Sequence, residues 1–104
     1  MDIKKNAIAA TATIDCDGLI LDASSASHTI PDIRVRAPDA LVAHEASVGK
    51  INEDTLFYLE SRGLDEASAR TLIVQGFAAP LIKKLPLEYA AEMNTLIAME
   101  MEGL

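Results

Sequence analysis

The sequence predicts an α+β protein whose first half is built from short strands and whose second half is helical. Residues 7–45 contain short runs of Thr, Ile, Val and Leu separated by turn residues, a pattern typical of strands. After residue 52, apolar residues recur at every third or fourth position, as in amphipathic helices. The change of period near Ile51 therefore divides the chain into residues 1–51 and residues 52–104.

The strands of residues 7–45 are expected to be short and to turn often. Apolar and charged residues alternate over residues 33–36, which predicts a half-buried strand. Turn signals occur at residues 15–18, 22–25 and 37–39. Since no Asn-Gly hairpin signal is present, a ladder of hairpins is disfavoured. Short strands with corner turns suit the coils of a solenoid, although no sequence repeat is visible.

About four helices are predicted in residues 52–104, and the first two have clear boundaries. Asn52 can accept a hydrogen bond from the first turn of one helix, and acidic residues follow it where the helix dipole favours them. Gly63 is suited to end that helix in a left-handed conformation. Asp65 is the expected N-cap of the second helix.

Glycine and proline are expected to divide the remaining helical part. Gly76 loosens or ends the second helix, and Pro80 fits the first turn of a short third helix over residues 81–85. Pro86 then starts a fourth helix that ends near Glu102. Its apolar stripe predicts core packing, with a docking face for another protein as the alternative. The stripe consists of Tyr89, Met93, Leu96, Ile97 and Met101.

Composition excludes several classes of partner and location. The net charge is −7, and the nine basic residues form no run beyond two Lys pairs, which argues against nucleic acid and anionic membranes. No apolar run approaches the roughly 20 residues of a spanning helix, and no apolar stretch follows the N-terminal charges as in a signal peptide. The only cysteine, Cys16, cannot form an internal disulfide, so a reducing cytoplasm is expected.

Five motifs occur in a specific order along the chain, at residues 15–21, 27–33, 44–47, 73–77 and 85–89. The first reads Asp-Cys-Asp-Gly-Leu-Ile-Leu, and the third, His44-Glu45-Ala46-Ser47, leads into the Gly-Lys turn before the first helix. Together they resemble the C-terminal part of the SufB/SufD family of iron–sulfur cluster assembly scaffolds. The His-Glu-Ala-Ser motif is similar to the SufB form, whereas SufD more often has His-Gly-Ala-Thr.

The resemblance implies a fold, partners and a cofactor. It implies that residues 1–51 are the last coils of a right-handed β-helix and that residues 52–104 form a small helical domain docking the ATPase SufC. An iron–sulfur cluster would be assembled transiently at the interface with a second SufB/SufD-type subunit, in a homodimer or heterodimer. Full-length members of the family are much longer than 104 residues.

Cys16 is the strongest candidate for cluster binding. Iron–sulfur clusters are held mainly by thiolates, usually with four protein ligands, so one thiol requires a site shared between subunits. The resemblance places Cys16 at the SufB cysteine implicated in assembly; the alternative is a small buried residue in a coil. Asp15 and Asp17 flank the thiol and disfavour a thiolate by charge repulsion, which argues against a pre-activated nucleophile.

His44 and Glu45 are the next candidates, because imidazole and carboxylate are both reasonable iron ligands. Adjacent residues of a strand point to opposite faces, so both reach one site only if the backbone bends. The resemblance favours Glu45 for the SufB-type role and His44 for the SufD-type role. The alternatives are a solvated acid for Glu45 and a hydrogen-bonded interface residue for His44, while His28 is expected to be a turn donor.

These features predict a scaffold rather than an enzyme. One alternative is an interaction module that only docks the ATPase and binds no cluster. A remote alternative is a Cys-dependent hydrolase using Cys16, His44 and Glu45, which the flanking acids and the missing oxyanion loop disfavour. Because the sequence contains no P-loop motif, any ATP hydrolysis must come from a partner.

Overall fold

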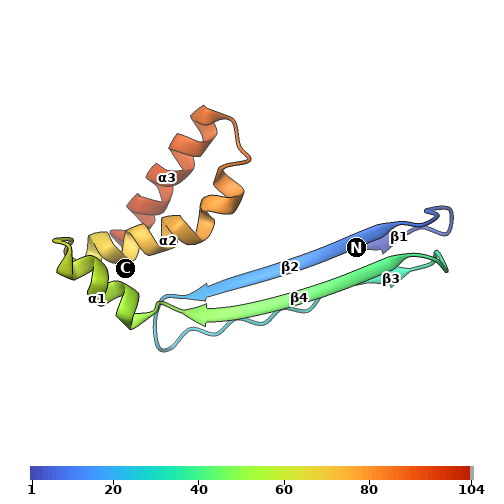
Figure 1. Ribbon diagram of the computed structural model, residues 1–104, viewed down its shortest axis with the longest axis horizontal. Helices are drawn as coiled ribbons and strands as arrows, with labels where there is room; N and C mark the ends of the chain where they lie inside the picture. The colour runs from blue at the N-terminus through green and yellow to red at the C-terminus, as the bar shows by residue number, and fades with distance from the viewer. Residues whose placement is uncertain (104) are drawn as a thin grey trace. The chain divides into compact units, whose positions relative to one another are not determined.

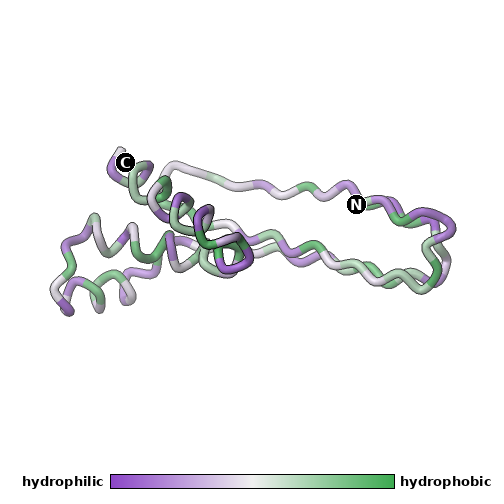
Figure 2. The backbone as a smooth tube through the Cα atoms, turned by 90° about the horizontal axis from the view of Figure 1, so that it is seen from above, coloured by the Kyte–Doolittle hydropathy of each residue, from purple (hydrophilic) through white to green (hydrophobic). Residues whose placement is uncertain are grey.

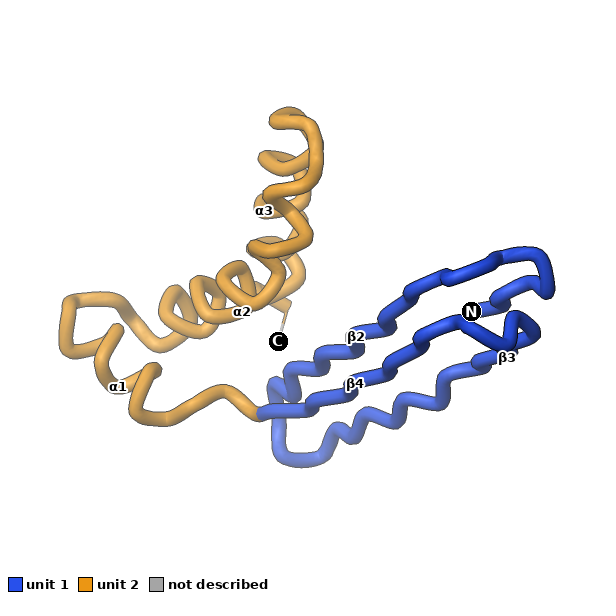
Figure 3. Tube along the Cα trace, turned by 45° about the vertical axis from the view of Figure 1, so that its right-hand side comes forward, with its two compact units in different colours: residues 1–49 blue, residues 50–104 orange. Residues whose placement is uncertain are grey.

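The computed structural model describes residues 1–103 and forms two compact units, which divide between Gly49 and Lys50 (Figure 3). The first unit is built from strands and the second from helices (Figure 1). The division falls close to the change of apolar period in the sequence, at Ile51.

The first unit contains two small sheets of two strands each. In one sheet, β1 (Asp2–Ile3) pairs in parallel with β3 (Arg34–Val35). In the other, β2 (Thr11–Ile20) lies beside β4 (Leu41–Lys50). Figure 1 shows β2 and β4 running in the same direction. Both sheets therefore join strands that are close in space and far apart in the sequence.

The spacing between paired residues shows that the chain makes one full circuit before it pairs with itself. Asp2 pairs with Arg34, 32 positions later. In the other sheet, the Asp17 carboxylate accepts a hydrogen bond from the hydroxyl of Ser47, 30 positions later. Parallel strands need such a long connection, because a tight turn can join only antiparallel ones. Here the connection contains a corner after β2, an extended return segment, β3 and a second corner.

Aspartates hold the corners of this circuit. Asp22 accepts hydrogen bonds from the backbone N–H groups of Ser24 and Ser25 at 2.7 and 2.9 Å, and both serine hydroxyls also donate to it. These bonds, with that of the Ser24 hydroxyl first, hold the pKa of Asp22 well below its ordinary value. Asp39 accepts from the backbone N–H of Ala9 at 2.8 Å, which joins the corners of successive circuits. The turns predicted at residues 22–25 and 37–39 are thereby confirmed.

Two predicted turns are wrong. β2 runs unbroken through residues 15–18, and β4 continues through the expected Gly-Lys turn to Lys50. Along β2, exposed and half-buried residues alternate, with Asp15 and Asp17 on the exposed side and Cys16 and Gly18 on the half-buried side. This alternation lets a strand carry two aspartates without a turn, since their carboxylates stay in water. The strand predicted over residues 33–36 is present but shorter, at Arg34–Val35, and both of its residues are exposed instead of half-buried. The expectation of short strands is wrong for β2 and β4, which have 10 residues each.

The second unit contains α1 (Glu53–Ser61), α2 (Glu66–Ile82) and α3 (Leu87–Met101), and both α1 and α3 pack against α2. The predicted boundaries of the first two helices are confirmed. The Asn52 side chain accepts from the Thr55 N–H at 3.0 Å, and the Asp65 side chain accepts from the Ser68 N–H at 2.9 Å. Gly63 ends α1 with φ +101°, a conformation that favours glycine. The buried side chains of the helices are Leu56, Ala69 and Ile82.

Three helices occupy residues 52–103, where about four were expected, because α2 continues to Ile82. The expected separate helix over residues 81–85 is the end of α2 followed by a turn. Gly76 costs about 1 kcal/mol of helix propensity, and Pro80 removes one hydrogen bond in the last turn. Packing against α1 and α3 overrides both effects. Figure 1 shows α2 bending in its C-terminal half, as expected for an internal proline.

We expect Ala9→Gly to stabilise the first unit. Ala9 has φ +52°, a left-handed conformation that costs a residue with a Cβ about 1 kcal/mol. Because glycine also loses more chain entropy on folding, urea unfolding followed by circular dichroism should show a smaller net gain, of about 0.5 kcal/mol. Ala10→Gly is the matched control, since Ala10 has no positive φ and should lose about 0.5–1 kcal/mol through chain entropy. Equal losses for both variants would contradict the prediction.

We expect Gly76→Ala to stabilise the helical unit by about 1 kcal/mol, the difference in helix propensity between the two residues. A Cβ at Gly76 would meet no atom within 4 Å, so the methyl group is accommodated. Thermal unfolding measures the effect. Gly63→Ala is the control and should destabilise the protein, because φ is +101° there. A lower melting temperature for Gly76→Ala would show that α2 needs the glycine.

Candidate functional site

The three predicted site residues all lie on the β2–β4 sheet, with Cys16 in β2 and His44 and Glu45 in β4. Their relation depends on the register of this sheet. At one end, the N–H of Leu41 donates to the carbonyl of Ala10 at 2.9 Å, which in a parallel pair places Leu41 opposite Thr11.

The register is the same at the other end of the sheet. The hydroxyl of Ser47 donates to Oδ1 of Asp17 at 2.5 Å. At the next pair along, a Cβ added to Gly18 would lie 3.4 Å from a methyl group of Val48, so Val48 stands beside Gly18. Partners are thus 30 positions apart at both ends, so no residue is inserted between them. Cys16 therefore lies opposite Ala46.

The sheet places Cys16 and His44 on one face and Glu45 on the other. Side chains alternate along a strand, so Cys16 shares its face with Ala46 and with His44, which is two positions earlier. From strand spacing and rise, the Cα atoms of Cys16 and His44 are roughly 8 Å apart. Glu45 lies on the opposite face, directly across from Asp15. The backbone bend that would let His44 and Glu45 reach one site is not present in this continuous strand.

The face that carries Cys16 looks toward the inside of the circuit. A Cβ added at Gly18 would lie 3.4 Å from a methyl group of Val48 and 3.5 Å from the Ser27 hydroxyl, which belongs to the return segment. Cys16 is half-buried on this face, whereas His44 on the same face and Glu45 on the other are both exposed. His28, expected to be a turn donor, lies exposed in the return segment.

The opposite face carries a row of acids, in which Asp15 and Glu45 face each other across the strands and Asp17 follows. Like charges placed directly opposite on a sheet repel and destabilise it. The hydroxyl of Ser47 partly offsets this repulsion by donating to Asp17. Neither Asp17–Ser47 nor the Gly18–Val48 contact was singled out in the sequence, since only the register reveals which residues meet.

Within residues 1–103, no three His, Cys, Asp or Glu side chains come together as a group that could hold a metal ion. The single chain offers a thiol and an imidazole on one face and a carboxylate on the other. An iron–sulfur cluster usually takes four protein ligands, so these donors do not by themselves form a cluster site.

The helical unit leaves part of its apolar surface uncovered. Of the stripe predicted on α3, Ile97 and Met101 are half-buried, whereas Tyr89 is 63% and Leu96 is 52% exposed, and Met93 is 39% exposed. The helix packs instead through a neighbouring face with small residues, where the Gln75 amide donates to the Asn94 carbonyl of α3 at 3.1 Å. Core packing thus accounts for only part of the stripe. Figure 2 shows apolar and polar residues interspersed along these helices.

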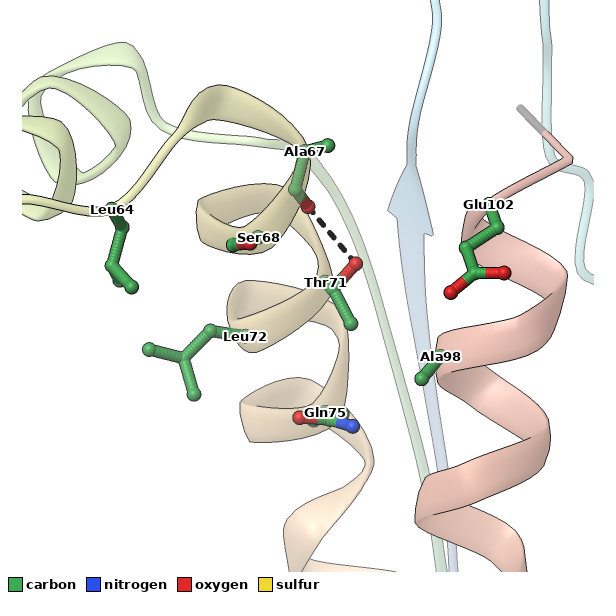
Figure 4. Close-up of a pocket in the computed structure, with 8 residues that line it drawn as sticks. All are labelled: Leu64, Ala67, Ser68, Thr71, Leu72, Gln75, Ala98 and Glu102. Atoms are coloured by element: carbon green, nitrogen blue, oxygen red, sulfur yellow. Dashed lines mark hydrogen bonds between the residues drawn. The ribbon is translucent and has the colours of Figure 1, made fainter.

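A groove of about 450 Å³ runs between α2 and α3 (Figure 4). Its apolar wall includes Leu64, Leu72 and Ala98, and its polar groups include Thr71 and Glu102. The Thr71 hydroxyl donates to the Ala67 carbonyl of its own helix at 2.9 Å, so that hydroxyl is already satisfied. The sequence did not predict this groove, because the grouping of its lining residues depends on how α3 packs.

None of the helices in the described part of the chain is both long enough and apolar enough to cross a membrane.

Comparison with known proteins gives a family model and curated relatives. The model described as "SUF system FeS cluster assembly, SufBD core domain" matches residues 1–77. An iron–sulfur cluster assembly SufBD family protein of Mycobacterium bovis is 44% identical over 103 residues, which are 99% of this chain. A protein of the same description from Staphylococcus saprophyticus is 50% identical over 99 residues, or 95% of this chain.

The chain spans only a small part of these relatives, 12% of the mycobacterial protein and 21% of the staphylococcal one. The family match itself covers most of the chain, including all four strands, α1 and much of α2. The order of the sequence motifs and the similarity over nearly the whole chain indicate the same family. This chain belongs to the SufBD family of the SUF system for iron–sulfur cluster assembly.

Proposed function

We propose that this chain is the part of a SUF scaffold that contributes Cys16, with Glu45 and His44, to the site where an iron–sulfur cluster is assembled. The observation that carries the proposal is the position of the chain's only thiol, on the strand face that it shares with His44. Cys16 is half-buried and therefore protected on one side, while His44 is open to a partner. The SufB-like His-Glu-Ala-Ser motif favours a SufB-type role for the chain.

The distribution of donors supports a site shared with a second SufB/SufD-type subunit, in a homodimer or heterodimer. Cys16 and Glu45 of one chain face opposite sides of the sheet. A cluster bound by both residue types would therefore take the thiolate from one subunit and the carboxylate from another. The strand β4 has no further strand beside it among residues 1–103, so its outer edge is open to such a partner.

We propose that the strands are the last coils of a right-handed β-helix. Parallel pairing at a distance of 30 to 32 positions supports this, because it stacks one circuit of chain on the next. Parallel crossover connections are right-handed in nearly all known sheets. In the longer family members, preceding coils would stack on β1 and β2. The fold proposal stands apart from the site proposal and can be tested by the structure of a longer chain.

We propose that the helical unit docks a SufC-type ATPase. Tyr89, Met93 and Leu96 form an exposed apolar patch on α3, and exposed Glu92 and Glu100 lie near it on the same helix. Such a surface suits a partner that presents apolar side chains flanked by Lys or Arg.

ATP hydrolysis belongs to the partner in this proposal, and the chain is a scaffold without catalysis of its own. The lone thiol also suits a cytoplasmic location.

We expect Cys16→Ser to abolish the visible absorption of this chain after anaerobic reconstitution with iron and sulfide, because the only soft ligand is lost. Glu45→Ala is expected to weaken the absorption less, since water or a neighbouring imidazole can replace a carboxylate. Absorption spectra and iron and sulfide analysis measure both, and circular dichroism checks the fold.

Full iron and sulfide content in Cys16→Ser would show that Cys16 is structural. If the unaltered chain binds no cluster but still binds the ATPase, the chain is a docking module only. The reconstitution experiment therefore separates the proposed function from its main alternative.

We expect Leu96→Asp to weaken binding of the cognate ATPase roughly tenfold or more, as for a central apolar contact residue. Leu96 is 52% exposed, so the change should leave the helix folded. Isothermal titration calorimetry measures the affinity. Ile30→Asp is the matched control: Ile30 is 92% exposed in the first unit, and its replacement should not change binding. Unchanged affinity in Leu96→Asp would remove α3 from the interface.

A further inference from the structure

The hydrogen bond between Ser47 and Asp17 lies next to Cys16 and to the residue opposite it. Asp17 follows Cys16 in β2, and Ser47 follows Ala46, the residue opposite Cys16. The Ser47 hydroxyl donates to Oδ1 of Asp17 at 2.5 Å, on the outer face of the sheet. The bond spans the two strands directly beside the thiol.

Little else fixes the position of β4 along β2 at this point. Register is strongly specified where one face of a strand is buried and weakly specified where both faces are exposed. All residues of β4 are exposed except Val42, which is half-buried near the start of the strand. Close to Cys16, the side-chain hydrogen bond between the two strands is that of Ser47 to Asp17, and Val48 stands beside Gly18.

The register decides which donor shares a face with the thiol. In the observed register, Cys16 lies opposite Ala46 and shares its face with His44. A shift by one residue turns every side chain of one strand to the other face relative to its partner. Cys16 would then lie opposite Glu45 or Ser47 and would share its face with Glu45 instead of His44.

We propose that Asp17 is a positioning residue: its hydrogen bond to Ser47 holds β4 in the register that keeps His44, and not Glu45, on the face of Cys16. The functional consequence rests on the proposed role of Cys16 in cluster binding. The register itself does not, and it can be measured without iron. A neutral acceptor at position 17 is sufficient for this role, because the bond needs only the oxygen that faces Ser47.

Disulfide formation measures the register directly, since Cys16 is the only thiol in the chain. Two parent chains are compared, each with one added cysteine. Ala46→Cys places a thiol opposite Cys16, within the Cα range of a disulfide. Glu45→Cys places a thiol on the face of the sheet that does not carry Cys16. Both are oxidised with diamide at low protein concentration, and intramolecular disulfide is quantified by non-reducing gel and peptide mass spectrometry. We expect the yield with Ala46→Cys to exceed that with Glu45→Cys at least tenfold.

Adding Asp17→Ala or Ser47→Ala should reduce this yield ratio at least threefold, and combining the two should have no further effect. Asp17→Asn keeps an acceptor oxygen and should restore the ratio. Global unfolding would bring the two yields together, because an unfolded chain forms both disulfides alike. The ratio is therefore measured well below the melting transition of every variant, where a lower ratio reports a change of register and not a loss of fold. Melting temperatures are recorded for every variant.

An unchanged ratio in Asp17→Ala and Ser47→Ala would overturn the proposal, and so would failure of Asp17→Asn to restore it. A low Ala46→Cys yield in the parent chain would overturn the register on which the proposal depends. Loss of cluster binding in reconstitution, with the yield ratio intact, would count against the proposed function and leave the positioning role standing.

Discussion

Parallel pairing between segments that are 30 to 32 positions apart is the constraint on which the first unit depends. It forces the chain through a full circuit before the strands meet, because parallel neighbours need a long crossover. The corners are then held by hydrogen bonds to carboxylates: Asp22 binds residues next to it, and Asp39 binds the corner of the preceding circuit. The same pairing leaves β4 with no further strand beside it within the described residues.

The alternation of side chains along the strands determines which potential ligands lie on the same face of the sheet. Three donors that are close in the sequence motif are separated by the sheet into an inner pair, Cys16 and His44, and an outer carboxylate, Glu45. Within one chain, the three donors therefore do not face a single site. In the helical unit, α3 packs through small residues, and its larger apolar side chains stay exposed.

Local signals predicted the helical boundaries well, because Asn52, Gly63 and Asp65 act through bonds to residues next to them. Local signals gave wrong predictions where tertiary packing determines the backbone conformation. The Asp-Cys-Asp-Gly run looked like a turn, yet pairing with β4 keeps it extended, and α2 passes through Gly76 and Pro80 because neighbouring helices hold it. The site residues themselves came from motif resemblance; which of them share a face required the register, and the separation of Cys16 from Glu45 could not be read from composition or spacing.

The register of β2 and β4 also bears on how such a chain tolerates insertions and deletions. A residue added in the corners or in the return segment lengthens a loop and leaves the strand faces as they are. One residue added between His44 and Ser47 would move His44 to the other side of the sheet while Ser47 stays bound to Asp17. Changes in length should therefore be absorbed at the corners, and the short stretch between the imidazole and the serine should admit none without losing the pairing of thiol and imidazole on one face.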